Sequence, residues 1–335
     1  MRIAARRLGI GFGSLAALAI GVATLRGQLP VVQPAAPNGA QATAAAKPDK
    51  APQAPRKLIR LVRDIHGDPI ALTTPIIHLV SKDPKRAGLS VDLIGAVHVG
   101  EKAYYAKLNK MFEQYDAVLY ELVAPKDTRP TAGVRSGSPI SAIQVGMKDF
   151  LELQFQLDEI DYKKKNFVHA DMSPDQFAKS MDARGESIWT MMAQMMGAGI
   201  AQQAGRANGS ETDLLMALFD KHRAIQLKRF MAGQMEDMEG AMGALDGPRG
   251  SAIITERNKA ALKVLGDEIG KGKKKIAIFY GAGHLADMEK RAREDFNLQR
   301  SGKVEWLEAW NLRLPGQDAK PAPEPTDDGP DAGKK

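Results

Sequence analysis

The stretch Leu89-Ser-Val-Asp-Leu-Ile-Gly-Ala-Val-His98 decides the fold of this chain. It is a short apolar run that ends in a glycine and a histidine, which predicts a buried strand followed by a sharp turn. Apolar residues at helical spacing follow over positions 104–115, and Asp116-Ala-Val-Leu-Tyr-Glu121 returns to strand character. A strand, a turn, a helix and a second strand in this order predict a βαβ-like unit, which favours a parallel sheet.

A similar arrangement recurs near the C-terminus. The segment Lys275-Ile-Ala-Ile-Phe-Tyr-Gly-Ala-Gly-His284 is followed by helical spacing over 285–296 and by strand character over 304–312. Glu121 and Glu308 stand at nearly the same distance beyond the two histidines, which suggests a pseudo-repeat, although two copies also fit a coincidence. We therefore predict an α/β (α+β) fold whose central mixed sheet is built from two strand-Gly-x-x-His-helix-strand half-units.

Composition divides the chain into four parts. Residues 1–27, with arginines before a run of small apolar residues, predict a signal peptide or a membrane anchor. Residues 28–57 are rich in Pro and Ala and predict a disordered linker, and 315–335 predict a disordered tail. Residues 58–314 form the predicted domain, with a mostly helical insert at about 141–270. The protein is thus expected to be exported, either periplasmic or extracellular, or tethered to a membrane.

Three local signals refine the domain. His66-Gly67-Asp68-Pro69 separates two β-rich segments and predicts a hairpin with its turn at Gly67. Ser173-Pro-Asp-Gln176 predicts a helix that starts with a capping box. A Met-rich helix is predicted at about 188–202, and a core or lid helix explains it better than a cofactor site does. Its role stays open.

Several classes of function are disfavoured by composition. The 335 residues contain no cysteine, so disulfides, thiolate nucleophiles and Cys-bound zinc are excluded. Any metal site has to use His, Asp and Glu. The net charge of +7 is spread along the chain, and aromatic residues make up only 6%, which argues against a nucleic-acid partner.

The two strand-terminal histidines are the main chemical signal. His98 and His284 are each expected where sheet proteins place ligand-facing side chains, at the carboxyl ends of strands. Glu121 closes a strand that we expect to pair beside the strand ending at His98. His98, Glu121 and His284 together make a candidate metal site of two imidazoles and one carboxylate, a set that suits metal-assisted hydrolysis of an amide or ester.

Other polar residues are weaker candidates. Arg257 precedes a predicted helix and is suited to binding a substrate carboxylate or an oxyanion, although an ordinary salt bridge explains it as well. His169 and Asp171 stand before the Ser173 cap, and turn chemistry explains Asp171. The roles of His169, Asp171 and Glu308 stay open at this point.

Taken together, the motifs resemble those of the TraB/GumN family, which is related to TIKI proteins and more remotely to erythromycin-esterase-like and ChaN-like domains. The resemblance covers roughly 58–314. It implies metal-dependent peptide cleavage with manganese or cobalt, zinc also being possible, and it maps the site onto His98, Glu121, Arg257 and His284. The segments that carry it are Gly95-Ala-Val-His98, Val118-Leu-Tyr-Glu121, Glu256-Arg-Asn258 and Gly281-Ala-Gly-His284.

The leading hypothesis is an exported metal-dependent hydrolase that acts on a peptide or another small substrate. The first alternative is a non-catalytic envelope protein of the same fold that binds a metal, haem or a peptide. The second is a structural envelope protein that uses the Met-rich helix as a contact surface. The sequence leaves open the substrate, the metal, the oligomeric state and whether the N-terminal segment is cleaved.

Overall fold

The structure is a computed structural model, and it describes residues 58–131, 151–187, 216–245, 250–317 and 320–322. The predicted export segment, the linker and the Met-rich helix lie outside these residues. Within the described part of the chain, no helix has the length and apolar character needed to cross a membrane.

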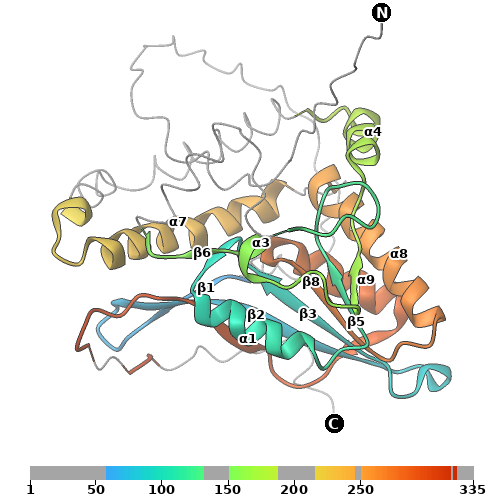
Figure 1. The fold of residues 1–335 in the computed structure, drawn as a ribbon, viewed down its shortest axis with the longest axis horizontal. Helices are drawn as coiled ribbons and strands as arrows, with labels where there is room; N and C mark the ends of the chain where they lie inside the picture. The colour runs from blue at the N-terminus through green and yellow to red at the C-terminus, as the bar shows by residue number, and fades with distance from the viewer. Residues whose placement is uncertain (1–57, 132–150, 188–215, 246–249, 318–319, 323–335) are drawn as a thin grey trace, which may run out of the picture.

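A mixed sheet of eight strands forms the centre of the described residues (Figure 1). Its four strands β3, β8, β5 and β7 are parallel, so their carboxyl ends meet at one edge. The predicted mixed sheet is thereby confirmed. The order along the sheet is β1 (Arg60–Arg63), β2 (Pro69–Ser81), β3 (Ser90–Ala96), β8 (Lys275–Gly281), β5 (Ala117–Tyr120) and β7 (Phe167–His169), and both β9 (Leu298–Arg300) and β10 (Glu305–Asn311) pair with β2.

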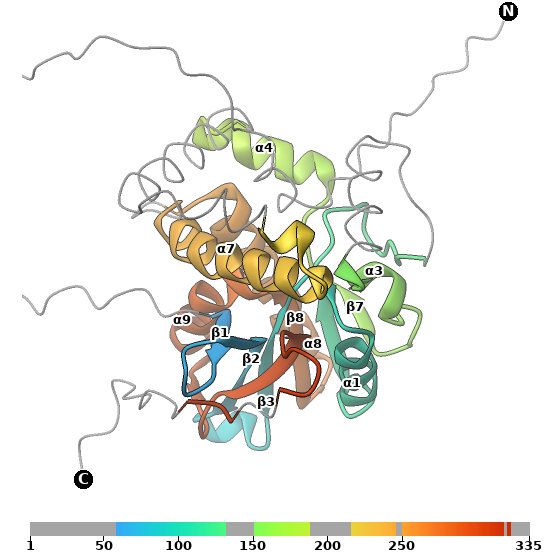
Figure 2. The ribbon, with the colours of Figure 1, turned by 90° about the vertical axis from the view of Figure 1, so that its left-hand side faces the viewer.

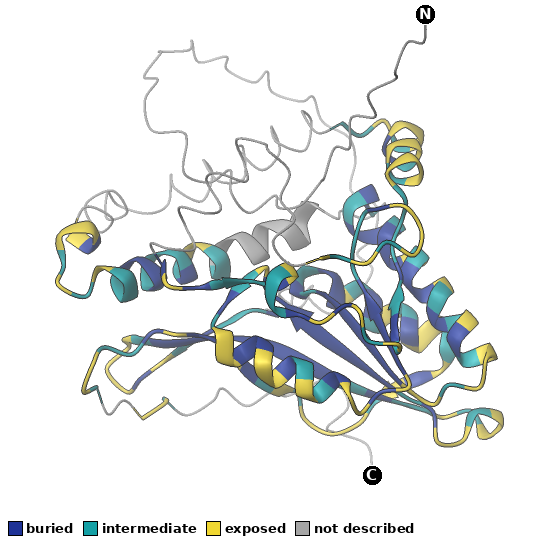
Figure 3. Cartoon of the chain, viewed as in Figure 1, coloured by how far each residue is buried: buried dark blue, intermediate teal, exposed yellow. Residues whose placement is uncertain are grey.

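Helices cover both faces of the sheet, as Figure 3 shows by the buried strands between them. Helix α1 (Lys102–Phe112) packs on one face, and α8 (Arg257–Gly270) with α9 (Leu285–Phe296) packs on the other (Figure 1). Side chains of β3 alternate accordingly: Ile94 joins the core under α1, whereas Leu93 joins the core under α8 and α9. Strands that are apolar on both faces are what a parallel sheet between helical layers requires.

The remaining elements are two further helices, the N-terminal hairpin and several short segments. Helix α7 (Arg223–Leu245) lies above this edge (Figure 2). Helix α4 (Pro174–Arg184) begins with the predicted capping box at Ser173, which is confirmed. The predicted hairpin is confirmed as well, with β1 antiparallel to β2 and Gly67 at a φ of 88°. The short elements are η2 (Pro84–Arg86), β4 (Val99–Gly100), which pairs with β6 (Gln154–Phe155), and α3 (Gln156–Glu159).

Two expectations about the sheet are wrong. Strand β8 lies between β3 and β5, so the strand that ends before Glu121 does not pair with the strand that leads to His98. The second half-unit does not repeat the first, because β10 returns antiparallel to β2, where Glu308 forms an exposed ion pair with Arg313. In addition, β7 is a strand inside the segment predicted to be mostly helical. Local patterns indicate that a strand exists, but its neighbours are chosen by long-range packing.

Gly95 permits close packing of β3 on β2. A Cβ atom at this position would lie 2.8 Å from Cδ and 3.3 Å from the carbonyl oxygen of Pro75. We therefore expect Gly95→Ala to lower the free energy of unfolding by about 1–3 kcal/mol, because the buried backbone has to shift. Urea unfolding measures this loss. The matched control is Gly233→Ala inside α7, where a new Cβ meets nothing within 4 Å and a gain of up to ~1 kcal/mol is expected. Equal effects of the two substitutions would contradict the packing role.

Candidate functional site

The carboxyl ends of the parallel strands bring the candidate residues to one edge of the sheet. In the strand register, Ala96 of β3 lies beside Gly281 of β8, and Tyr120 of β5 lies beside Phe279 of β8. His98 and Glu121 therefore emerge on either side of the turn that carries His284. This turn is the 3-10 element η4 (Ala282–His284), against which α7 packs. Glu121 and His284 meet at this edge, although Glu121 reaches it across β8.

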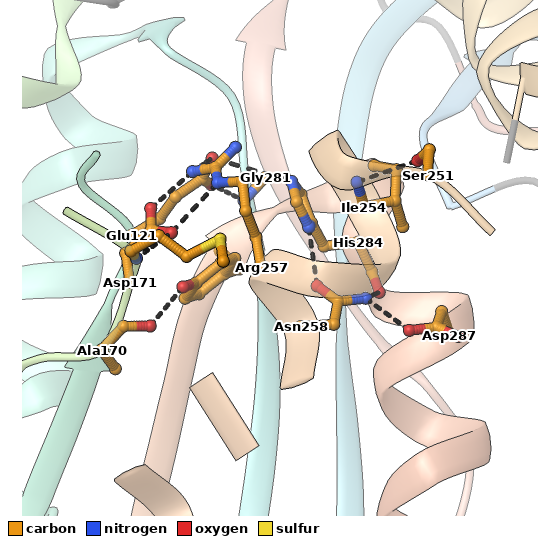
Figure 4. Close-up of polar contacts among 12 residues, drawn as sticks. Glu121, Ala170, Asp171, Ser251, Ile254, Arg257, Asn258, Gly281, His284 and Asp287 are labelled. Atoms are coloured by element: carbon orange, nitrogen blue, oxygen red, sulfur yellow. Dashed lines mark hydrogen bonds and ion pairs between the residues drawn. The ribbon is translucent and has the colours of Figure 1, made fainter. Parts of the chain in front are cut away.

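Glu121 is held in place from two sides. Its Oε2 accepts a hydrogen bond from the backbone N–H of Gly281 at 2.7 Å. Its Oε1 accepts one from Nη2 of Arg257 at 2.7 Å. A Cβ atom at Gly281 would lie 3.3 Å from Oε2, so the glycine of the second Gly-x-x-His motif leaves room for this carboxylate. The carboxylate thus has a fixed orientation (Figure 4).

Arg257 is shared between two carboxylates. It follows the π-helical turn η3 (Ala252–Glu256) and starts α8. Besides Glu121, it binds Asp171, with Nε at 3.0 Å from Oδ1 and Nη2 at 2.5 Å from Oδ2. The Asp171 side chain is 0% exposed. When both carboxylates are ionised, one positive guanidinium faces two negative charges. This group of three side chains then has a net negative charge.

The ionisation of Glu121 follows from these contacts. Burial is the largest single influence and raises the pKa of the Glu121 carboxyl, but the adjacent Arg257 guanidinium, the two nearby imidazoles and the Gly281 N–H together outweigh it and hold this pKa well below its usual range. Burial likewise acts to lower the pKa of Arg257, and the two carboxylates raise it further than burial lowers it. Glu121 is therefore a carboxylate and Arg257 a cation at neutral pH.

Asn258 fixes the tautomer of His284. The Asn258 side-chain N–H group donates to the His284 carbonyl at 3.0 Å and to Asp287 at 2.9 Å, so its oxygen has to face the imidazole. That oxygen lies 2.7 Å from Nδ1 of His284, and a hydrogen bond there requires the proton on Nδ1. In the neutral ring the Nε2 lone pair is then free, and Nε2 lies 3.7 Å from Oε1 of Glu121 (Figure 4). A hydrogen bond that holds one ring nitrogen in this way orients the other nitrogen to act as a metal ligand or a base.

His284 is kept neutral by its surroundings. Burial lowers the pKa of this imidazole to about 4, and the nearby Glu121 carboxylate, which favours the charged form, does not compensate. A neutral ring at physiological pH retains its Nε2 lone pair. His284 is therefore suited to accepting a cation or a proton, and not to donating a proton from Nε2.

His98 is exposed, in contrast to His284. It lies in the short loop between β3 and β4, and its carbonyl accepts a hydrogen bond from the Gln156 N–H at 2.9 Å. The charged form of its ring acts on the pKa values of both Glu121 and His284, so it belongs to the same neighbourhood. Next to it, Oε1 of the buried Gln156 has no hydrogen-bond partner among the described residues, as is expected of a group that meets water or a ligand.

The other polar candidates are placed differently. His169 directs Nε2 at the Leu122 carbonyl, 2.6 Å away, so that nitrogen is occupied. Glu308 lies on β10 opposite Thr73 of β2, and its carboxylate pairs with Arg313. Asp171, unlike His169, contacts the candidate site directly, since both of its carboxylate oxygens accept hydrogen bonds from Arg257. The sequence alone left the role of Asp171 open. It gave no role to Asn258, although Asn258 directly follows Arg257.

The donor set fits a divalent metal in chemistry, although the described residues contain no group of three or more His, Asp and Glu side chains arranged to hold a metal ion. The 3.7 Å between His284 Nε2 and Glu121 Oε1 is shorter than two metal–ligand bonds of about 2.1 Å laid end to end. A free imidazole lone pair and a carboxylate in a negatively charged group form suitable donors. His98 is the remaining donor of the predicted set.

No family model matches the chain, and neither the comparison with curated proteins nor that with solved structures found a match. The resemblance to the TraB/GumN family therefore stays a prediction.

The lowered pKa of His284 makes stability depend on pH. An unfolded histidine has a pKa of about 6.5, so the unfolded chain takes up the proton at a higher pH than the folded one. In the metal-free protein, we expect the free energy of unfolding to fall between pH 6.5 and about 4, with up to about 3 kcal/mol due to this residue. Urea unfolding at a series of pH values in a chelator measures the slope. His284→Gln removes this contribution; an identical slope in the variant would contradict a neutral, buried His284.

Arg257 is expected to stabilise the fold through both carboxylates. Arg257→Met leaves Glu121 and Asp171 buried without their cation, and we expect a loss of about 3–5 kcal/mol in the free energy of unfolding. Adding Glu121→Gln to that variant should restore part of the loss, because one buried charge is removed. Urea unfolding of the two single variants and the double variant measures this coupling. Arg313→Met, at an exposed ion pair with Glu308, is the control and should cost at most ~1 kcal/mol.

Proposed function

We propose that this protein is an exported metal-dependent hydrolase that cleaves a peptide or another small amide or ester substrate. In this proposal it is similar to TIKI-like members of the TraB/GumN family. The N-terminal segment 1–27 provides export or a membrane tether, and the working site is the edge that carries His98, Glu121, Arg257 and His284.

One observation carries the proposal. His284 is buried, neutral and fixed with its Nε2 lone pair towards the Glu121 carboxylate, 3.7 Å away. A lone pair that faces a carboxylate without a proton between them is unfavourable, unless a cation or a hydrogen-bond donor lies there. Since Arg257 already balances only one of two carboxylates, the site favours an additional positive charge.

Each residue then has a role. His284 and Glu121 hold the metal, with His98 as the third ligand, and a bound divalent ion would activate water and polarise a carbonyl. Asn258 keeps the His284 proton on Nδ1. Arg257 fixes the direction of Glu121 with Nη2, while Nη1 makes no hydrogen bond with the described residues. That N–H group is available for a substrate carboxylate or for the oxyanion that develops during amide cleavage.

The proposal predicts metal-dependent cleavage that is lost with either histidine. We expect the purified protein to bind Mn²⁺, Co²⁺ or Zn²⁺ and to cleave members of a mixed peptide library, as measured by titration calorimetry and mass spectrometry. His98→Ala and His284→Ala should lower the rate of cleavage at least about 100-fold, in line with the loss of a metal ligand or its support. A chelator should abolish the activity.

The matched control is His66→Ala, which removes an exposed histidine in the turn between β1 and β2. It should leave metal binding and cleavage unchanged. Cleavage that persists in both site variants would reject the assignment. Metal, haem or peptide binding without product, with every metal tested, would instead favour the non-catalytic binding protein.

A further inference from the structure

A hollow lies at the opposite, amino-terminal end of the parallel strands. Its cavity volume is about 600 Å³, in the range of small-molecule sites. The starts of β3 and β8 contribute to it through Ser90 and Lys275, and β2, α1 and β10 form the remaining walls. Apolar side chains of Ile76, Val80 and Met111 are part of its lining. This hollow is thus separate from the edge that carries Glu121 and His284.

The floor of the hollow is a fixed polar network. Asp92 is only 9% exposed, and both of its carboxylate oxygens are engaged. Tyr115 donates its hydroxyl proton to Oδ2 at 2.6 Å, and Nδ1 of His78 lies 2.8 Å from Oδ1. Because a carboxylate can only accept, His78 carries a proton on Nδ1 and its ring is held in one orientation. The His78 ring is therefore a fixed part of the floor of the hollow.

The rim of the hollow is positively charged. Lys107, Lys110 and Lys275 all line it, and none of the three has an ion-pair partner within 4 Å in the described part of the chain. Lys275 Nζ lies 5.3 Å from the centre of the Tyr115 ring and 3.4 Å from the Gln114 side-chain oxygen. Glu305 is the opposing charge, with Oε2 at 3.8 Å from Nε2 of His78, and its side chain is 49% exposed. With the charge of Asp92 directed to Tyr115 and His78, cations prevail at the opening.

We propose that this hollow binds a small organic anion, with a phosphate- or carboxylate-type group on the lysines and an apolar part on Ile76, Val80 and Met111. Lysines bind such groups as point charges, and an apolar wall favours an anion that carries a ring or a short chain. The exposed Glu305 carboxylate repels the ligand and weakens its binding. This site goes beyond the proposed hydrolase, since it shares none of that site's residues.

Titration of the full-length protein with phenylphosphonate, methylphosphonate and benzoate tests the proposal. Calorimetry gives the affinities, and the NMR signal of the His78 ring reports where the ligand binds. We expect phenylphosphonate or benzoate to bind with displacement of the His78 signal, and methylphosphonate to bind more weakly than phenylphosphonate. The double variant Lys107→Gln and Lys110→Gln should weaken binding about tenfold, since two charge-assisted contacts are lost.

Two further variants give matched controls. Lys102→Gln removes an exposed lysine of the same helix that does not line the hollow, and it should leave the affinity unchanged. Glu305→Gln removes the opposing charge and should strengthen binding. The proposal is overturned if no probe binds, if the Lys102 variant and the double variant lose affinity equally, or if the Glu305 variant binds more weakly. Equal affinities for methylphosphonate and phenylphosphonate would overturn the role of the apolar wall.

Discussion

The shared guanidinium of Arg257 is the interaction on which the carboxyl-end edge of the sheet depends. It joins the end of β5, through Glu121, to the segment after β7, through Asp171, and it does so from the first residue of α8. Isolated buried carboxylates are strongly disfavoured, because the protein interior does not replace their hydration. Their burial is possible only with this cation and with backbone donors such as the Gly281 N–H. The same contacts that hold three elements together therefore orient the carboxylate of the candidate site.

The charges at this edge and the state of His284 depend on each other. A protonated His284 would complete the balance of charge with Glu121 and Asp171, yet burial lowers the pKa of this imidazole to about 4. The group therefore remains one positive charge short at neutral pH. Asn258 accepts a hydrogen bond from the Nδ1–H group, so within the neutral ring Nε2 is the nitrogen without a proton. Burial thus keeps the ring neutral, and Asn258 decides which of its nitrogens faces Glu121.

Parts of this arrangement could be predicted from the sequence, and the reason differs from residue to residue. The strands before His98 and His284 were identifiable because a parallel strand buried on both faces is a continuous apolar run. The insertion of β8 between β3 and β5 was not, since strand order depends on contacts between segments far apart in the chain. The roles of Asp171 and Asn258 were also out of reach, because an Asp before a helix or an Asn within one has many local explanations. Only the three-dimensional contacts distinguish among them.

The two histidines of the repeated motif are not equivalent, and this difference bears on how such a site works. His284 is the N-cap residue of α9 and lies in a buried turn. Asn258 holds its ring and fixes its proton on Nδ1. His98 is exposed in a short loop, where its backbone carbonyl accepts a hydrogen bond from the Gln156 N–H. A fixed ligand supplies the geometry of a site, whereas an exposed one can adjust when a cation or substrate arrives. The strand-Gly-x-x-His pattern therefore delivers two imidazoles to one edge, and the packing around each of them decides which is rigid.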